Sequence, residues 1–246
     1  MTPTSIIDAS WQLYRKHFRV FILPLALLLI AGAAAVLIGR TPYESPLTIA
    51  VVVLAMLVFS WMDGTLLILS ANLLEKKSGE VQNALIHSLK ILGPLVALSF
   101  ITQFLISAGL VLLIIPGIAL AYLLALSLPD LVLADRGLLA SLGQSVRMLA
   151  KKNNLRHTIL AIAVPWIFWQ IVLFLSAGIL IMLAGVAARS FPSLDFLASR
   201  TAFLFIIILL SSLIRPLILT YLVIVYQSLT HTNANTLTPN DLTPQP

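Results

Sequence analysis

An uncharged stretch of 39 residues, positions 91–129, most constrains what this chain can fold into. A single helix of that length would measure about 58 Å, roughly twice the ~30 Å thickness of the hydrocarbon core of a bilayer. Pro116 and Gly117 form the strongest helix breaker near its middle, because proline cannot continue the backbone hydrogen-bond ladder and glycine tolerates the dihedral angles of a tight turn. The stretch therefore predicts two membrane-spanning helices joined by a hairpin turn at Pro116 and Gly117.

The composition of the whole chain requires a bilayer as its solvent. Of its 246 residues, 60% are hydrophobic and 10% are charged, and the mean hydropathy is +1.04, whereas a soluble domain carries about 25% charged residues. Only helices and closed barrels can cross a membrane, and the long continuous apolar runs exclude a barrel, whose strands alternate in polarity. The absence of cysteine excludes disulfides and thiolate metal sites. The predicted fold class is an all-α polytopic membrane protein.

The apolar runs predict six membrane-spanning helices within a single domain, residues 1–229. Residues 230–246 are rich in Thr, Asn and Pro and contain no Lys or Arg, which predicts a disordered tail. The predicted spans are residues 20–39, 47–74, 93–115, 118–134, 158–184 and 201–229.

Three basic segments precede the predicted hairpins, at residues 1–19, 75–90 and 138–156. Apolar residues recur in them about every three or four positions with basic residues between, which predicts amphipathic helices lying on the membrane surface. For residues 1–19 the alternative is that the segment simply flanks the first span. The lipid bilayer is the expected partner, with anionic headgroups as candidate ligands of these segments. A nucleic-acid partner is not expected, because the basic residues gather at the ends of apolar runs.

The distribution of basic residues predicts the orientation in the membrane. Eleven of the fifteen Lys and Arg residues lie in residues 1–19, 75–90 and 135–157. The loops on the opposite side contain three, Arg40, Arg189 and Arg200. Since Lys and Arg concentrate in cytoplasmic loops, both termini are predicted to face the cytoplasm.

Two charged residues lie inside predicted spans, Asp63 in the second and Arg215 in the sixth. An unpaired charge there costs at least ~2.5–3.5 kcal/mol. Asp63 is 11 residues from Leu74 and Arg215 is 14 from Leu229, so their depths differ by only about 5 Å at ~1.5 Å per residue. An ion pair between the two spans would satisfy both charges, either to fix helix packing or to serve transport. The competing interpretation is that Arg215 extends to the membrane surface by itself.

Other chemistry is weakly indicated. Asp130 is a weaker candidate than Asp63, because it lies about four residues from the end of its predicted helix, from where it can reach water. The four histidines, at positions 17, 87, 157 and 231, fall on polar flanks and predict no metal site. Because the sequence contains neither a nucleotide-binding loop nor a nucleophile elbow, we expect no enzyme activity and no cofactor.

A family resemblance rests on residues 112–145 and on the opening segment. An apolar helix is followed by Ile-Pro-Gly-Ile at residues 115–118, a short helix, Pro129, a small polar exit, and an amphipathic helix that leads through Ser145 to basic residues; Ala-Ser-Trp-Gln-Leu-Tyr-Arg opens the chain at residues 9–15. This pattern resembles the YciC-like family of bacterial inner-membrane proteins and the related membrane domain fused to some glycerophosphodiester phosphodiesterases. The resemblance implies a six-helix protein of the bacterial inner membrane with no established activity. Asp130 departs from the pattern, which has an apolar residue there.

The functional prediction follows from what the apolar runs lack. Polar residues stand isolated in them rather than forming a stripe shared by several spans, as a permeation path would require. The leading hypothesis is therefore a non-enzymatic multi-pass membrane protein with a structural or envelope-maintenance role. The alternative is a small transporter or lipid-handling protein that uses Asp63, Arg215 and the proline-broken hairpin.

Overall fold

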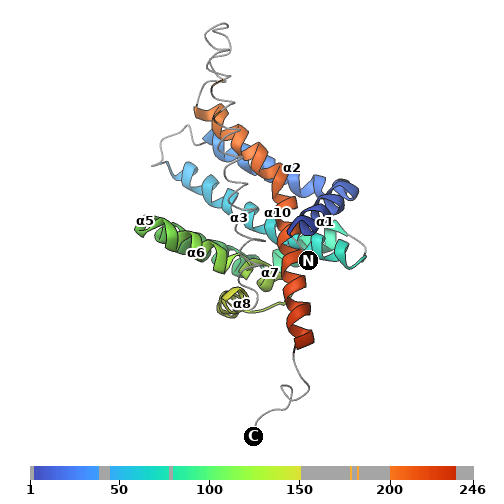
Figure 1. Cartoon of the computed structure of the whole chain (residues 1–246). Coiled ribbons are helices and arrows are strands. Elements are labelled where there is room, and N and C mark those ends of the chain that lie inside the picture. Colours follow the sequence, from blue (N-terminus) through green and yellow to red (C-terminus); the bar gives the residue numbers. More distant parts are fainter. Residues whose placement is uncertain are drawn as a thin grey trace.

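The computed structural model describes residues 3–38, 45–77, 80–150 and 200–236, together with Gly178 and Met182. All regular structure in these residues is helical, which confirms the all-α part of the predicted fold class (Figure 1). The predicted fifth span, residues 158–184, lies outside the described residues apart from Gly178 and Met182. The helices are α1 (Pro3–Lys16), α2 (Phe18–Ile38), α3 (Pro46–Leu74), α4 (Val81–Lys90), α5 (Leu92–Leu112), α6 (Ile114–Leu124), α7 (Ser127–Leu133), α8 (Leu138–Ala150) and α10 (Arg200–Thr236).

Four helical segments in this part of the chain are long and apolar enough to cross a membrane. They are α3, α5, the segment Ile115–Leu133 that includes α7, and Ile207–Thr230 within α10. There is a fifth candidate span if α1 and α2 are counted as one. The axes of these two helices are bent by 86° relative to each other. By length and composition the chain is thus a multi-pass membrane protein, with four or five of the six predicted spans among the described residues.

α3 is the central helix of the bundle and packs against α2, α4, α5, α7 and α10 (Figure 1). Its first half exposes apolar side chains such as Leu47 and Val53, whereas every residue from Met62 to Leu67 is buried. A helix that is apolar and covered on all sides belongs to the interior of a bundle. Asp63 therefore lies where α3 enters the protein core.

α5 and α6 form a hairpin, and its turn lies three residues before the predicted position. The only residue between the two helices is Leu113, which is extended with φ −161° and ψ 133°. Pro116 and Gly117 consequently lie in the first turn of α6, where proline is tolerated because the first N–H groups of a helix have no intrahelical acceptor. Gly117 is not needed for a positive φ angle, since no described glycine has a positive φ. It permits close approach of α5, because a Cβ added at Gly109 would lie 2.9 Å from the Cα of Gly117.

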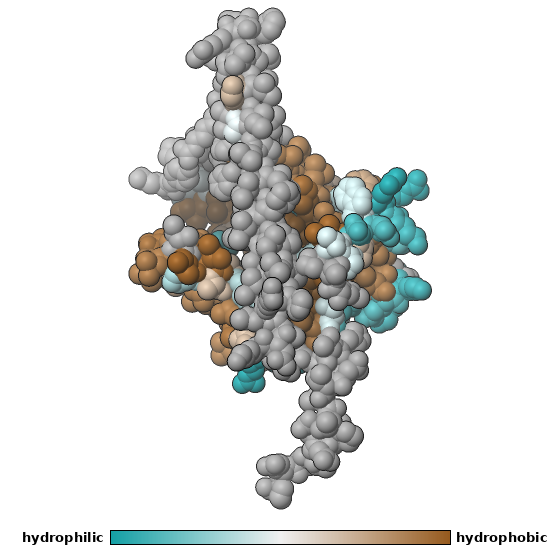
Figure 2. Space-filling view, in the orientation of Figure 1, coloured by the Kyte–Doolittle hydropathy of each residue, from teal (hydrophilic) through white to brown (hydrophobic). Residues whose placement is uncertain are grey.

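The turn of this hairpin is apolar and projects from the bundle. Figure 2 shows hydrophobic surface around it, while hydrophilic side chains gather on the opposite side of the view. Val111, Leu112 and Ile115 are 87%, 78% and 80% exposed. Large apolar side chains this exposed fit contact with lipid acyl chains rather than with water.

The predicted fourth span, residues 118–134, is interrupted between α6 and α7. Ser145 of α8 bridges the break: its Oγ donates to the carbonyl of Leu123 at 2.7 Å and accepts the N–H of Leu126 at 3.2 Å. Ser127 Oγ donates to the carbonyl of Leu124 at 2.6 Å. Backbone groups freed by the break are thus satisfied by side chains, as an apolar solvent requires.

Among the described residues α10 is the longest helix, with 37 residues. It continues to Thr236, so the helix extends past Leu229 into the region predicted as a tail; residues 237–246 lie outside the described residues. α10 packs against α1, α2, α3 and α7. It therefore contacts both the N-terminal helices α1–α3 and α7, the short helix that carries Asp130.

Candidate functional site

Asp63 of α3 and Arg215 of α10 form a bidentate ion pair. Arg215 Nε donates to Asp63 Oδ1, and Arg215 Nη2 donates to Asp63 Oδ2 at 2.6 Å. The side chain of Asp63 is 10% exposed and that of Arg215 is 35% exposed. The guanidinium carbon also lies 5.3 Å from the centre of the Phe59 ring, within the range of a cation–π contact. The structure thus brings together the two charged residues that the sequence singled out, and both carboxylate oxygens are occupied.

The residues around Asp63 hold the neighbouring helices close to it. A Cβ at Gly64 would lie 2.6 Å from Leu95 Cδ1, so glycine allows α5 to approach α3 at this level. Thr65 and Ser88 hydroxyls are 2.7 Å apart, and Trp61 Nε1 donates to the carbonyl of Leu85 at 3.0 Å. These hydrogen bonds fix α4 on α3 beside the ion pair.

A second polar contact lies further along the same pair of helices. The hydroxyls of Ser70 and Thr220 are 2.8 Å apart, and both residues are fully buried. Ser70 follows Asp63 on α3, and Thr220 follows Arg215 on α10. Because both steps run toward the C-terminus, α3 and α10 are parallel, as the predicted topology requires.

Asp130 of α7 is the most deeply buried carboxylate in the described part of the chain. Tyr226 Oη donates to Asp130 Oδ1 at 2.9 Å, and Arg136 Nη1 lies 3.4 Å from the same oxygen. Its side chain is 1% exposed, and Oδ2 has no hydrogen-bond partner among the described residues. The prediction that Asp130 can reach water from near its helix end is therefore wrong, because α8 and α10 pack against α7 and the residue is fully buried.

These three contacts form what we call the polar seam: Asp63–Arg215, Ser70–Thr220 and Asp130–Tyr226. Each contact has one member on α10, and successive members are five or six residues apart, which is about 7.5–9 Å along a helix. The polar residues are thus paired between helices, and the three pairs follow one another along α10 without sharing one face of it. That spacing exceeds the reach of a direct hydrogen bond, so these three pairs by themselves do not form a continuous relay.

Replacing Tyr226 by phenylalanine is expected to lower the free energy of unfolding by roughly 0.6–1.7 kcal/mol, the range of interhelical hydrogen bonds in membranes. The ring remains in the hydrophobic cluster that includes Leu126 and Met148, but Asp130 loses its close donor. The loss should shrink in an Asp130→Leu background, where no carboxylate remains. Thermal unfolding of the four proteins in detergent measures this coupling, and equal losses in both backgrounds would contradict it.

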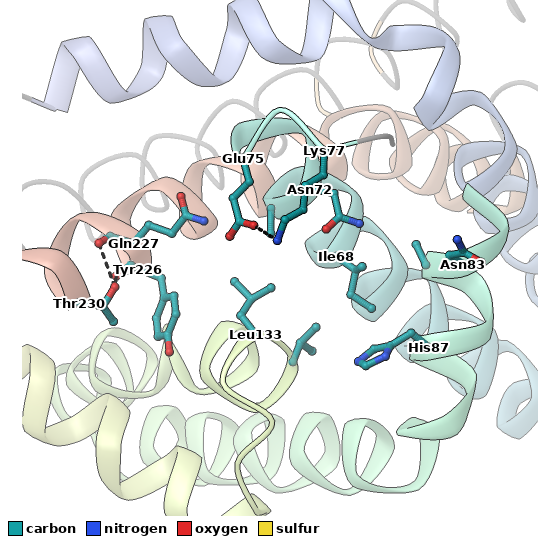
Figure 3. Close-up of a pocket in the computed structure, with 13 residues that line it drawn as sticks. Ile68, Asn72, Glu75, Lys77, Asn83, His87, Leu133, Tyr226, Gln227 and Thr230 are labelled. Atoms are coloured by element: carbon teal, nitrogen blue, oxygen red, sulfur yellow. Dashed lines mark hydrogen bonds and ion pairs between the residues drawn. The ribbon is translucent and has the colours of Figure 1, made fainter. Parts of the chain in front are cut away.

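A cleft of about 560 Å³ opens beyond the last contact of the polar seam (Figure 3). It lies between the C-terminal end of α3, α4, the end of α7 and α10. Ile68, Val132 and Leu133 contribute an apolar part of its wall. Glu75 and Lys77 are ion-paired at one side. The other hydrogen-bonding side chains that line it are Asn72, Asn83, His87, Tyr226, Gln227 and Thr230.

Sequence reasoning missed Tyr226, Arg136 and the cleft. A tyrosine in an apolar run does not differ in pattern from a packed aromatic residue, so Tyr226 carried no signal. Arg136 did carry a sequence signal, because it lies six residues after Asp130, in the polar segment that follows the predicted fourth span. The cleft combines side chains from four separate segments, and only the fold assembles them.

Among the described residues, no group of three or more His, Cys, Asp or Glu side chains is placed to hold a metal ion. The buried charges are instead paired with cations or a hydroxyl of the chain itself, an arrangement suited to structural pairing or to regulated opening of a pair. No protein-family model, curated protein or solved structure matches the chain.

Proposed function

We propose that this chain is a non-enzymatic multi-pass membrane protein whose role is structural or in envelope maintenance. The observation that supports this most directly is the closure of the Asp63–Arg215 pair. Both carboxylate oxygens accept hydrogen bonds from one guanidinium, so the Asp63 carboxylate is not offered to a cargo. The contacts of the polar seam connect α10 to α3 and α7, which suits a role in fixing helix register.

The second candidate is a small transporter or lipid-handling protein that uses Asp63 and Arg215. The alignment of polar contacts along α10, with a cleft at one end, favours it. The local break in helical hydrogen bonding between α6 and α7, inside the span Ile115–Leu133, is a second feature in its favour, since discontinuous helices line the binding sites of many transporters. This function requires the ion pair to open during the working cycle.

Complementation with a charge-free pair separates the two candidates. A bacterial strain lacking this gene would be profiled for lipid composition and sensitivity to envelope stress, then supplied with either the wild-type protein or the variant Asp63→Leu/Arg215→Met. A structural role predicts that the double variant, if it accumulates normally, restores the wild-type profile. A transport role predicts a protein that accumulates but does not restore it. An unchanged profile in the deletion strain itself would overturn the envelope-maintenance proposal.

We place the protein in the bacterial inner membrane with six spans and both termini in the cytoplasm. The Lys and Arg distribution and the resemblance to the YciC-like family support this placement. Reporter fusions at Thr41, Ser78, Leu138, Pro192 and Gln245 test it. Periplasmic activity is expected at Thr41 and Pro192 only, and periplasmic activity at Ser78 or Gln245 would contradict the topology.

A further inference from the structure

The cleft lies at the level where three candidate spans end. Asn72 is in the last turn of α3, Leu133 ends the span Ile115–Leu133, and Thr230 ends the span Ile207–Thr230. All three residues line the cleft (Figure 3). The end of a span marks the boundary between hydrocarbon and headgroups, so a ligand in this cleft would sit at headgroup depth.

The lining offers both signs of charge beside an apolar wall. Glu75 and Lys77 provide a carboxylate and an ammonium group, while Ile68 and Leu133 are apolar (Figure 3). His87 and Gln227 add hydrogen-bonding groups at two other sides. The cleft therefore suits an amphiphile that carries one positive and one negative group. Its volume lies in the ~300–1,000 Å³ range of small-molecule sites.

The Glu75–Lys77 pair is available to a ligand in a way that Asp63–Arg215 is not. Its side chains are 47% and 67% exposed, and an exposed ion pair is held only weakly because water competes for both partners. A ligand's ammonium and phosphate can each replace one member of the pair, so that neither charge is stranded.

The backbone holds Glu75 and Lys77 at the mouth of the cleft. Lys76 between them adopts the left-handed conformation, with φ 55°. Its N–H donates to the carbonyl of Leu73 at 3.3 Å, and the N–H of Lys77 donates to the carbonyl of Asn72 at 2.9 Å. This is the hydrogen-bond pattern of a Schellman motif, which usually contains glycine at the position of Lys76. The backbone thus turns at the end of α3, which keeps Glu75 and Lys77 beside the cleft.

From these observations we propose that the cleft binds the headgroup of a phospholipid bearing a primary amine, such as phosphatidylethanolamine. Its ammonium donates to Glu75, its phosphate accepts from Lys77, and the start of its acyl region lies against Ile68 and Leu133. A choline headgroup has no N–H to donate to Glu75. A purely anionic headgroup would meet the Glu75 carboxylate without a compensating positive group. This inference does not rest on the structural role proposed above.

Lipid retention by the full-length protein tests the site. The protein would be purified in mild detergent, mixed with phosphatidylethanolamine, phosphatidylcholine or phosphatidylglycerol of identical acyl chains, and examined by native mass spectrometry. We expect the wild-type protein to retain phosphatidylethanolamine about two- to fivefold better than phosphatidylcholine, because water competes for the exposed Glu75 carboxylate and limits what the extra hydrogen bond contributes. Glu75→Gln should bring the ratio near one, Glu75→Asp should preserve most of it, and Lys77→Met should weaken retention of every phospholipid.

Matched controls are Asp8→Asn and Lys90→Met, which change exposed charges that do not line the cleft. They should behave as wild type. Near-equal retention of phosphatidylethanolamine and phosphatidylcholine by the wild-type protein would overturn the proposal, as would stronger retention of phosphatidylglycerol. The same holds if the controls lose selectivity like Glu75→Gln. Displacement of the lipid by an equimolar amount of soluble phosphoethanolamine would overturn the assignment to a membrane lipid. Equal melting temperatures of all variants, measured on the same samples, exclude misfolding as the cause.

Discussion

Replacing Arg215 by methionine is expected to lower the free energy of unfolding by about 3–5 kcal/mol, because the change leaves the carboxylate of Asp63 buried without its cation. Methionine keeps much of the arginine's length, so the loss does not come mainly from an empty volume. In wild type both oxygens of Asp63 accept hydrogen bonds from this guanidinium. The measurement is helix content followed by circular dichroism as SDS is added to protein in detergent micelles.

The double variant Asp63→Leu/Arg215→Met should recover most of that loss. Apolar residues of similar size often replace a buried ion pair without penalty, since the cost of removing two charges from water disappears with the charges. A coupling energy of several kcal/mol is therefore expected in the complete thermodynamic cycle. Arg147→Met, at an exposed position on α8, is the matched control and should change stability by less than about 0.5 kcal/mol.

Two results would contradict this account of the ion pair. One is that the effects of Asp63→Leu and Arg215→Met add within about 0.5 kcal/mol, as those of distant residues do. The other is that Arg215→Met is as stable as the Arg147→Met control. Either result would mean that Asp63 finds another partner, or that water reaches the carboxylate through the partly exposed side of Arg215.

The pairing of Asp63 with Arg215 could be predicted from sequence because charge is rare in an apolar run. Each residue alone is expensive in a bilayer, and the constant rise of a helix converts sequence position into depth. Those two facts are enough to match one acid with one base across two spans. The same method gave the wrong environment for Asp130, because distance from a helix end says nothing about which other helices cover it. α10, almost a hundred residues later in the chain, supplies Tyr226 and closes that site.

The breaks in the helices show a similar limit. Pro116 indicated that a break was near, but proline fits the first turn of a helix as well as the turn before it, so its position was uncertain by several residues. The break between α6 and α7 is followed by Pro129 in the first turn of α7, and this proline has no N–H for the carbonyl of Ala125. Ser145, on a later helix, supplies the hydrogen bonds that make it stable. A proline therefore indicates that a helix break is near, but the residues that form the break and the side chain that satisfies it are set by the fold.

Replacing Gly117 by alanine is expected to destabilise the α5–α6 hairpin by about 1–3 kcal/mol, and valine should cost more. A Cβ at Gly117 would lie 2.6 Å from the backbone nitrogen of Leu110, too close for any atom that cannot move aside. Since the obstacle is the backbone of α5, the two helices must separate. Alanine would otherwise favour a helix by about 1 kcal/mol relative to glycine. The measured loss of stability is therefore smaller than the free-energy cost of the steric clash itself.

Two glycines in open surroundings distinguish this close contact from a general effect of glycine replacement. Gly93 lies in α5 itself and Gly143 in α8, and an added Cβ meets nothing within 4 Å at either position. Gly93→Ala and Gly143→Ala should be neutral or stabilising by up to about 1 kcal/mol, in the same SDS titration. If Gly117→Ala behaves like these controls, the helices of the hairpin are not in backbone contact, and Gly117 has no packing role. If Gly117→Ala is destabilising while both controls are not, the glycine pair Gly109 and Gly117 holds the hairpin closed, although the turn itself is formed by Leu113 alone.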